Sequence, residues 1–196
     1  MVWDFVEHWT LRFGISLFFI FMFSNPQHNI EQFALGDGMR VADFGSGSGA
    51  YALAAARAVG NDGKVYAIDV QESSLARLKK VAEEARLHAV EVVRGNLEKA
   101  GGSGLRDEGV HAVIASNILF QIKDKGAFVK EVKRVLHHGG LVLLVDWSGS
   151  FGGTGPEESA VVKEDTAKAL FLAEGLSYEK SIDAGTYHYG LVFKKG

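Results

Sequence analysis

The sequence predicts an α/β protein: a doubly wound, seven-stranded, mostly parallel sheet with helices on both faces and an antiparallel strand at the C-terminal end. Three observations support this fold class. Short apolar runs alternate with segments of helical periodicity between residues 40 and 145, which is the pattern of strands joined by right-handed helical crossovers. A glycine-rich turn joins the first run to the first helix, and the last two runs are close enough to form a hairpin.

Each expected strand is a short run of apolar residues bounded by turn residues. Strands are expected at residues 40–44, 64–69, 89–94, 110–115, 141–145, 176–182 and 187–194. The segments between them carry apolar residues at helical spacing. Helices are expected at 26–34, 50–59, 128–136 and 159–173. Another helix is expected to begin after a cap at Ser73 or Ser74 and to end at 85. No helix is expected between 95 and 109, where repeated glycines indicate a mobile loop.

The first strand is followed by the sequence Asp43-x-Gly45-x-Gly47-x-Gly49. Glycine permits positive φ angles and has no Cβ, so the backbone can approach a ligand closely while the N–H groups of the following helix point toward it. The junction between a strand and a helix is also where α/β sheets bind nucleoside cofactors. Gly45, Gly47 and Ala50 satisfy the dinucleotide fingerprint as well, so the loop alone leaves the cofactor open.

An acidic residue, Asp69, closes the second strand. Dinucleotide-binding proteins place an acid there that accepts hydrogen bonds from ribose hydroxyls. These residues leave open an NAD(P)-dependent oxidoreductase, another nucleoside-binding enzyme, and a non-catalytic regulator that binds a nucleoside.

The glycine motif with its preceding aspartate resembles motif I of the class I S-adenosylmethionine-dependent methyltransferases, a Rossmann-like family of small single domains. Segments 92–97, 110–117 and 134–143 resemble that family alone, in the order in which the family has them. The family often has aspartate where this chain has Asn96. The resemblance implies S-adenosylmethionine as cofactor and S-adenosylhomocysteine as product.

The resemblance also implies a set of cofactor-binding residues around the carboxyl ends of the first four strands. They are Asp43, Gly45, Ser46, Gly47, Gly49, Tyr51, Asp69, Val70, Asn96, Leu97 and Asn117.

The 196 residues fit one domain, in which we expect 39–196 to form the cofactor-binding core and 1–38 an N-terminal cover. The formal charge of −3 gives no general attraction to nucleic-acid phosphates, so a small-molecule acceptor is expected. The chain has no cysteine, which excludes disulfides and thiolate chemistry and argues against the arsenite methyltransferases of the same family. A cytoplasmic location is expected.

The first 24 residues contain an apolar run, 11–23, that is rich in phenylalanine. The run is shorter than the ~20 residues that span a membrane and contains Arg12. A secretory signal would have a basic start, whereas Asp4 and Glu7 precede this run. The remaining interpretations are a buried cover over the sheet, a homodimer interface, and shallow membrane contact.

Three side chains at the expected ligand edge could carry chemistry: Asn117, Asp146 and His188. Asn117 could orient the methionine part or the acceptor, Asp146 could act as a base, and histidine is the natural base near neutral pH. Each also has a structural alternative, as a loop cap or as a histidine hydrogen-bonded at a strand end. No metal site is expected, because His137 and His138 are adjacent at the end of the expected helix, before a turn, and adjacent side chains on a helix point apart.

Overall fold

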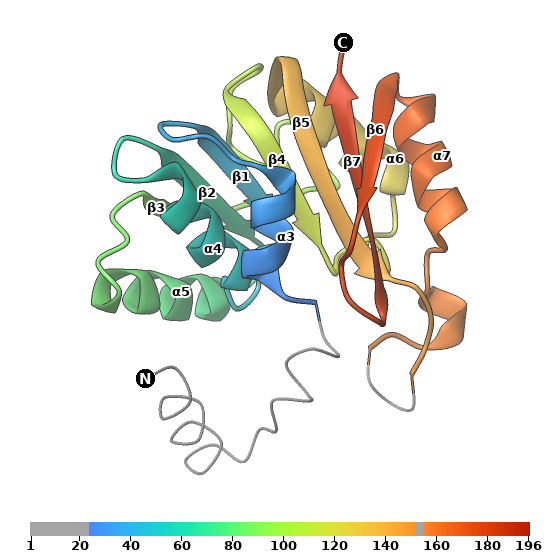
Figure 1. The fold of residues 1–196 in the computed structure, drawn as a ribbon, viewed down its shortest axis with the longest axis horizontal. Coiled ribbons are helices and arrows are strands. Elements are labelled where there is room, and N and C mark those ends of the chain that lie inside the picture. The colour runs from blue at the N-terminus through green and yellow to red at the C-terminus, as the bar shows by residue number, and fades with distance from the viewer. Residues whose placement is uncertain (1–23, 152–154) are drawn as a thin grey trace.

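The computed structural model describes residues 24–151 and 155–196. Its centre is a seven-stranded sheet with the order β3-β2-β1-β4-β5-β7-β6, shown in Figure 1. The strands are β1 (Arg40–Phe44), β2 (Lys64–Asp69), β3 (Val90–Arg94), β4 (Val110–Ser116), β5 (Leu136–Trp147), β6 (Leu176–Ile182) and β7 (His188–Lys195). β1 to β5 pair in parallel, whereas β7 pairs antiparallel with both β5 and β6. The predicted fold class, including the antiparallel last strand, is therefore confirmed.

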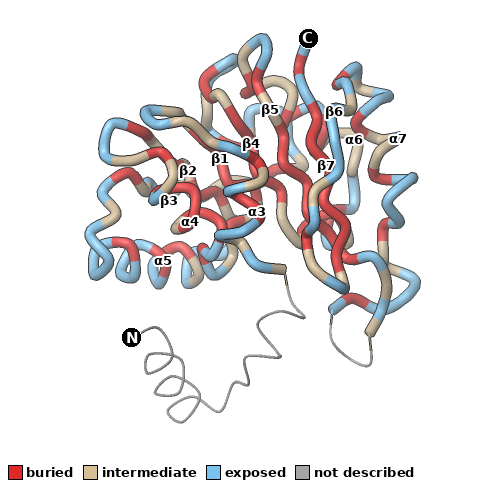
Figure 2. The backbone as a smooth tube through the Cα atoms, viewed as in Figure 1, coloured by how far each residue is buried: buried red, intermediate tan, exposed pale blue. Residues whose placement is uncertain are grey.

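Two apolar layers cover the sheet, one on each face. The described helices are α3 (Pro26–Phe33), α4 (Ala50–Val59), α5 (Glu72–Glu84), α6 (Lys125–Val135) and α7 (Glu164–Ala173), with a short 3-10 turn at Glu158–Ala160. Residues of α3, α4 and α5 pack with Val41, Val65 and Leu143 on one face. Residues of α6 and α7 pack with Phe44, Leu144 and Phe193 on the other. Figure 2 shows the buried strands between these exposed helical surfaces.

Helix α3 is part of this packing. Asn25 caps it, with its side chain accepting the N–H of His28, and Pro26 occupies the first turn as predicted. Gln32 near its end exchanges two hydrogen bonds with the backbone of Asp183, at 2.8 and 3.0 Å. The described part of the expected N-terminal cover, 24–38, is thus fixed to the α4 face. The apolar run 11–23 lies outside the described residues.

Several boundaries differ from the sequence prediction, including the starts of α5, α7 and β5. α5 begins at Glu72 after Gln71 rather than after a serine cap, and an acidic residue in a first turn is stabilised by the helix dipole. α7 begins at Glu164, because residues 161–163 are extended after the 3-10 turn. β5 begins at Leu136, so His137 and His138 lie in a strand rather than in a helix.

The parallel strands and the antiparallel β7 meet at one edge of the sheet, at the bottom of Figure 1. The carboxyl ends of β1 to β5 and the amino end of β7 lie there, since Ser116 pairs with Val145 and Trp147 pairs with His188. No helix of the described ranges is both long and apolar enough to cross a membrane.

Candidate active site

The glycine loop after β1 has a backbone that only glycine adopts without strain. Gly45 and Gly49 have φ angles of +78° and +86°. A Cβ on Gly45 would lie 2.2 Å from Cδ1 of Ile118, and one on Gly49 would lie 2.1 Å from Cδ1 of Leu78. The loop therefore needs glycine both for its turn and for its close packing under the neighbouring loop and helix.

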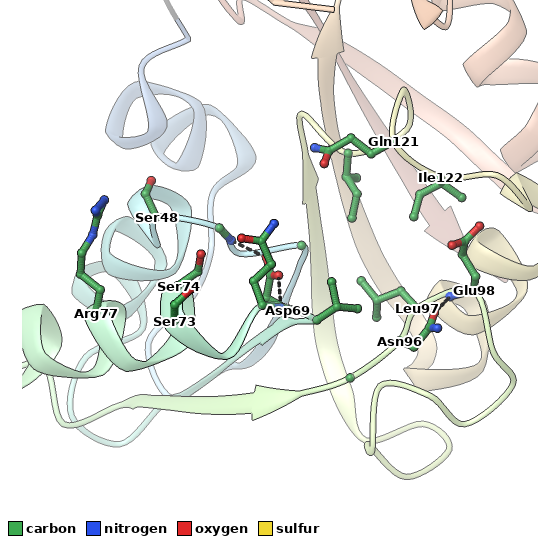
Figure 3. Close-up of a pocket in the computed structure, with 16 residues that line it drawn as sticks. Ser48, Asp69, Ser73, Ser74, Arg77, Asn96, Leu97, Glu98, Gln121 and Ile122 are labelled. Atoms are coloured by element: carbon green, nitrogen blue, oxygen red, sulfur yellow. Dashed lines mark hydrogen bonds between the residues drawn. The ribbon is translucent and has the colours of Figure 1, made fainter.

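A cavity of about 750 Å³ opens beside this loop at the carboxyl edge, within the range of ~300–1,000 Å³ typical of small-molecule sites. Its walls come from the loops after β1, β2, β3 and β4 and from the start of α5 (Figure 3). Of the predicted cofactor residues, six line it: Gly45, Gly47, Asp69, Val70, Asn96 and Leu97. The other five, Asp43, Ser46, Gly49, Tyr51 and Asn117, do not line it.

Asp69 stands where β2 ends and joins two loops. One carboxylate oxygen accepts the N–H of Gly47 at 2.9 Å, and the other accepts the N–H of Gln71 at 2.9 Å, as the dashed lines in Figure 3 show. A carboxylate oxygen can accept more than one hydrogen bond. Asp69 can therefore hold the two loops and still accept from hydroxyl groups of a ligand.

Another part of the lining is apolar and contains the side-chain amide of Asn96. Val70, Leu97, Ile118 and Ile122 line the cavity, and Val70 is 55% exposed, which is unusual for a valine in a strand-end turn. The side-chain oxygen of Asn96 accepts the N–H of Glu98 at 3.0 Å. The group that Asn96 can offer to a flat heterocycle is therefore its amide N–H₂.

Behind the glycine loop lies a buried acid, Asp43, which is 1% exposed. The pKa of Asp43 is raised to about 7, mainly by burial; the backbone N–H of Ala52 lowers the pKa, and the charge of Asp69 makes a smaller contribution that raises it. One of its carboxylate oxygens has no hydrogen-bond partner. A buried acceptor without a partner is costly, so this oxygen is suited to a cationic or N–H-bearing group of a ligand.

Tyr51 also makes structural contacts, and its cofactor-binding role stays a prediction. Its hydroxyl lies 2.6 Å from the hydroxyl of Ser24 and accepts the amide N–H₂ of Asn29 at 2.6 Å. The pKa of Tyr51 is raised, mainly by burial. In this structure Tyr51 therefore ties α3 to the start of α4.

The three catalytic candidates lie side by side at the same edge but differ in their contacts. Asn117 has a positive φ of +52°, and its side-chain oxygen is buried without a partner. Asp146 accepts the N–H of Leu119 and that of Trp147, each at 2.8 Å, so it fixes the loop after β4, and burial raises its pKa to about 6. His188 packs against Trp147 with 4.3 Å between ring centroids and an angle of 39° between the ring planes.

Sequence reasoning missed two parts of the cavity lining. The loop after β4 contributes Ile118, Gln121 and Ile122, and the start of α5 contributes Ser73, Ser74 and Arg77. The position of the first three directly after an apolar strand was the available signal, because loops at the carboxyl ends of parallel strands bind ligands. Arg77 carries no comparable signal, since charged residues are common on helix surfaces.

The strand order separates the remaining interpretations of the fold. A dinucleotide-binding Rossmann sheet has the order 3-2-1-4-5-6, whereas here an antiparallel β7 is inserted between β5 and β6. With the glycine loop and the acid at the end of β2, this topology defines a class I, Rossmann-like methyltransferase.

Comparison with known proteins agrees with this assignment. A family model described as "Methyltransferase domain" matches residues 35–183, and the chain belongs to this family. A solved S-adenosylmethionine-dependent methyltransferase from Aquifex aeolicus superposes with a TM-score of 0.80 at 25% identity, over 97% of this chain and 96% of that one. The cofactor is therefore S-adenosylmethionine, with S-adenosylhomocysteine as the product.

Two curated relatives match a shorter region. The arsenite methyltransferase of Mus musculus is 31% identical over 113 residues, covering 55% of this chain and 30% of that protein. The demethylmenaquinone methyltransferase of Bacillus mycoides (strain KBAB4) is 32% identical over 111 residues, covering 57% of this chain and 46% of that protein. The chain thus spans less than half the length of these relatives.

The residues present fit the cofactor. The unpartnered oxygens of Asp43 and Asn117 suit a positively charged methionine part, and the carboxylate of Asp69 suits hydroxyl groups of a ribose. The apolar walls with the Asn96 amide suit an adenine.

Proposed function

We propose that this protein transfers the methyl group of S-adenosylmethionine to a small-molecule acceptor. The cofactor supplies an electrophilic methyl group on a sulfonium centre. Asp69 holds the ribose, Asn96 and Leu97 border the adenine, and Asp43 with the glycine loop holds the methionine part.

The proposal of a small acceptor rests on the burial of the sheet edge beyond the cavity, at the ends of β5 and β7. Trp147 and His188, at the ends of β5 and β7, are each only 8% exposed. An extended nucleic-acid surface would need exposed basic and aromatic groups there. A narrow, buried site also excludes water, which helps the nucleophile to stand in line with the methyl group.

The names of the relatives narrow the chemical class of the methyl acceptor. Arsenite is a thiophilic ion, and a chain without cysteine has no thiolate to hold it. An organic acceptor, as the name demethylmenaquinone methyltransferase implies for that relative, agrees better with the buried aromatic pair Trp147 and His188.

Calorimetric titration with S-adenosylhomocysteine, with NAD and with NADP tests the cofactor site. The proposal predicts binding of S-adenosylhomocysteine and none of either dinucleotide, and the reverse result would favour an oxidoreductase. Incubation of the protein with a metabolite extract and methyl-labelled cofactor then tests transfer. Tight cofactor binding without label in any small molecule would favour the regulator instead.

A further inference from the structure

The cavity occupies only part of the carboxyl edge. It is lined by the loops after β1 to β4, while the ends of β5 and β7 lie beyond it along the sheet. A methyl acceptor must lie next to the donor and outside the volume that the donor fills. The loop after β4 is the boundary between the two regions, so the acceptor belongs over the ends of β5 and β7.

At the ends of β5 and β7, His188 is a buried polar residue whose ring makes no hydrogen bond. Both ring nitrogens are buried without a hydrogen-bond partner. The ring packs against Trp147, but this contact supplies no hydrogen bond. Buried polar groups in folded proteins almost always have a partner, and an exception calls for an explanation. A ligand that supplies the missing hydrogen bonds is such an explanation.

The surroundings of His188 select a neutral ligand group. Burial alone lowers the pKa of His188 to about 4, so the ring is neutral near pH 7 and gives a carboxylate no counter-charge. Asp146, the acid next to Trp147 in the chain, already accepts hydrogen bonds from the N–H groups of Leu119 and Trp147. Because side chains alternate along a strand, Asp146 faces the side of the sheet opposite Trp147 and His188, and it gives an ammonium group no partner there.

A hydroxyl group matches what the ring lacks. A neutral imidazole has one nitrogen that donates and one that accepts, and a hydroxyl can donate to the accepting nitrogen. At neutral pH phenols carry an uncharged O–H, whereas alkyl amines are protonated and carboxylic acids are ionised.

We propose that His188 is the acceptor-binding residue of the methyl-transfer site and that it selects acceptors with a neutral hydroxyl group, whose O–H donates to the imidazole. Trp147 holds the ring in place from one side. This inference rests on the proposed function, because it takes the cavity beside the glycine loop as the cofactor site.

The test measures direct binding of four matched probes to protein saturated with S-adenosylhomocysteine, by NMR titration. They are 4-ethylphenol, 1-ethyl-4-fluorobenzene, 4-ethylbenzoate and 4-ethylbenzylamine. We expect the phenol to bind at least ~10-fold more tightly than the fluoro compound, as one hydrogen bond to a buried group allows, and more tightly than either charged probe. A lack of phenol binding, or a preference for a charged probe, would overturn the inference.

His188→Phe is the decisive variant, because it keeps a flat ring against Trp147 and removes both nitrogens. The preference for the phenol over the fluoro compound should disappear, while the affinity for S-adenosylhomocysteine stays within about twofold. His88→Phe, which makes the same change at an exposed turn before β3, is the control and should keep the preference. A preference that survives in His188→Phe contradicts the assignment of His188, whereas a parent protein that does not bind S-adenosylhomocysteine contradicts the proposed function.

Discussion

Two buried polar regions of this protein differ in how completely their hydrogen bonds are made. Glu131 on α6 is 2% exposed and accepts the N–H groups of Gly101 and Ser103 at 2.9 and 3.0 Å. Arg134, one turn later, donates to Glu131 and to the carbonyl of Leu105. At the carboxyl edge, by contrast, Asp43, Asn117 and His188 each keep a buried polar atom without a partner.

The difference separates a structural role from a binding role. The Glu131 network completes its own bonds and fixes the loop after β3, which replaces the helix that a crossover usually has. The carboxyl edge leaves polar atoms that a bound ligand can satisfy. Substitutions in the first region should therefore change stability, and substitutions in the second should change binding.

Glu131→Ala should have the largest effect on stability. It leaves the N–H groups of Gly101 and Ser103 without their acceptor and removes the Glu131 carboxylate from the Arg134 guanidinium. Removing one partner of a fully buried pair costs ~3–5 kcal/mol, which is the upper limit for this part-exposed pair. Urea denaturation of the parent and the variant measures this loss. Glu131→Gln, which keeps one acceptor oxygen, should lose less, and equal stability of all three proteins would contradict the structural role.

Acid should weaken the same network. Hydrogen bonds from Arg134, Ser103 and Gly101 outweigh burial and lower the pKa of Glu131 from 4.5 to about 2. Because the folded pKa lies below the unfolded one, the stabilisation is complete above pH 4.5 and is lost as the pH falls toward 2. Urea midpoints between pH 6 and pH 3 should therefore fall more steeply for the parent than for Glu131→Gln, and parallel curves would show that Glu131 is not the source.

Asp69→Ala should have the largest effect on cofactor binding. It removes charge-assisted hydrogen bonds of ~1.5–3 kcal/mol each, so the affinity for S-adenosylhomocysteine should fall at least ~10-fold. Calorimetry measures the affinity, and Asp62→Ala, in an exposed turn before β2, is the control. An Asp69→Ala protein that binds like the parent would remove Asp69 from the ribose site.

A smaller, pH-dependent effect is expected at Asp43. Its raised pKa of about 7 means that the unliganded folded protein holds a proton that the unfolded chain has lost, so stability without ligand should fall as the pH rises from about 4 to 7. A cationic ligand group favours the ionised form, so the affinity for S-adenosylhomocysteine should rise between pH 6 and pH 8. Asp43→Asn should bind more weakly with a flatter pH profile, and a parent affinity independent of pH would separate Asp43 from the ligand.

The sequence could predict the parts that depend on neighbours in the chain. The segment from β1 through α4 to β2 follows from apolar runs, turn glycines and an alanine-rich helix, and its boundaries match the structure. The predicted start of α5 was wrong. Ser73 and Ser74 are good helix caps locally, yet the first turn of α5 begins one residue before them. The fixed loop at 95–109 could not be read from its glycines, because Glu131 and Arg134 hold it from a distant helix.

The site divides in the same way. Gly45 and Asp69 are recognisable from their spacing, whereas the contact of Tyr51 with Ser24 and Asn29 and the unpartnered ring of His188 depend on tertiary packing. The position of 11–23 as a cover, dimer interface or membrane contact stays a prediction. Cofactor binding by a protein lacking residues 1–24 would test whether the remaining residues, 25–196, suffice for binding.

A crystal structure with S-adenosylhomocysteine tests the contrast between the two regions most directly. The unpartnered oxygens of Asp43 and Asn117 should each gain a hydrogen bond from the ligand or from a water bound to it, Asp69 should contact the ribose, and the contacts of Glu131 should stay as they are. A ligand bound elsewhere, or one bound beside the glycine loop that leaves both oxygens without partners, would contradict the account.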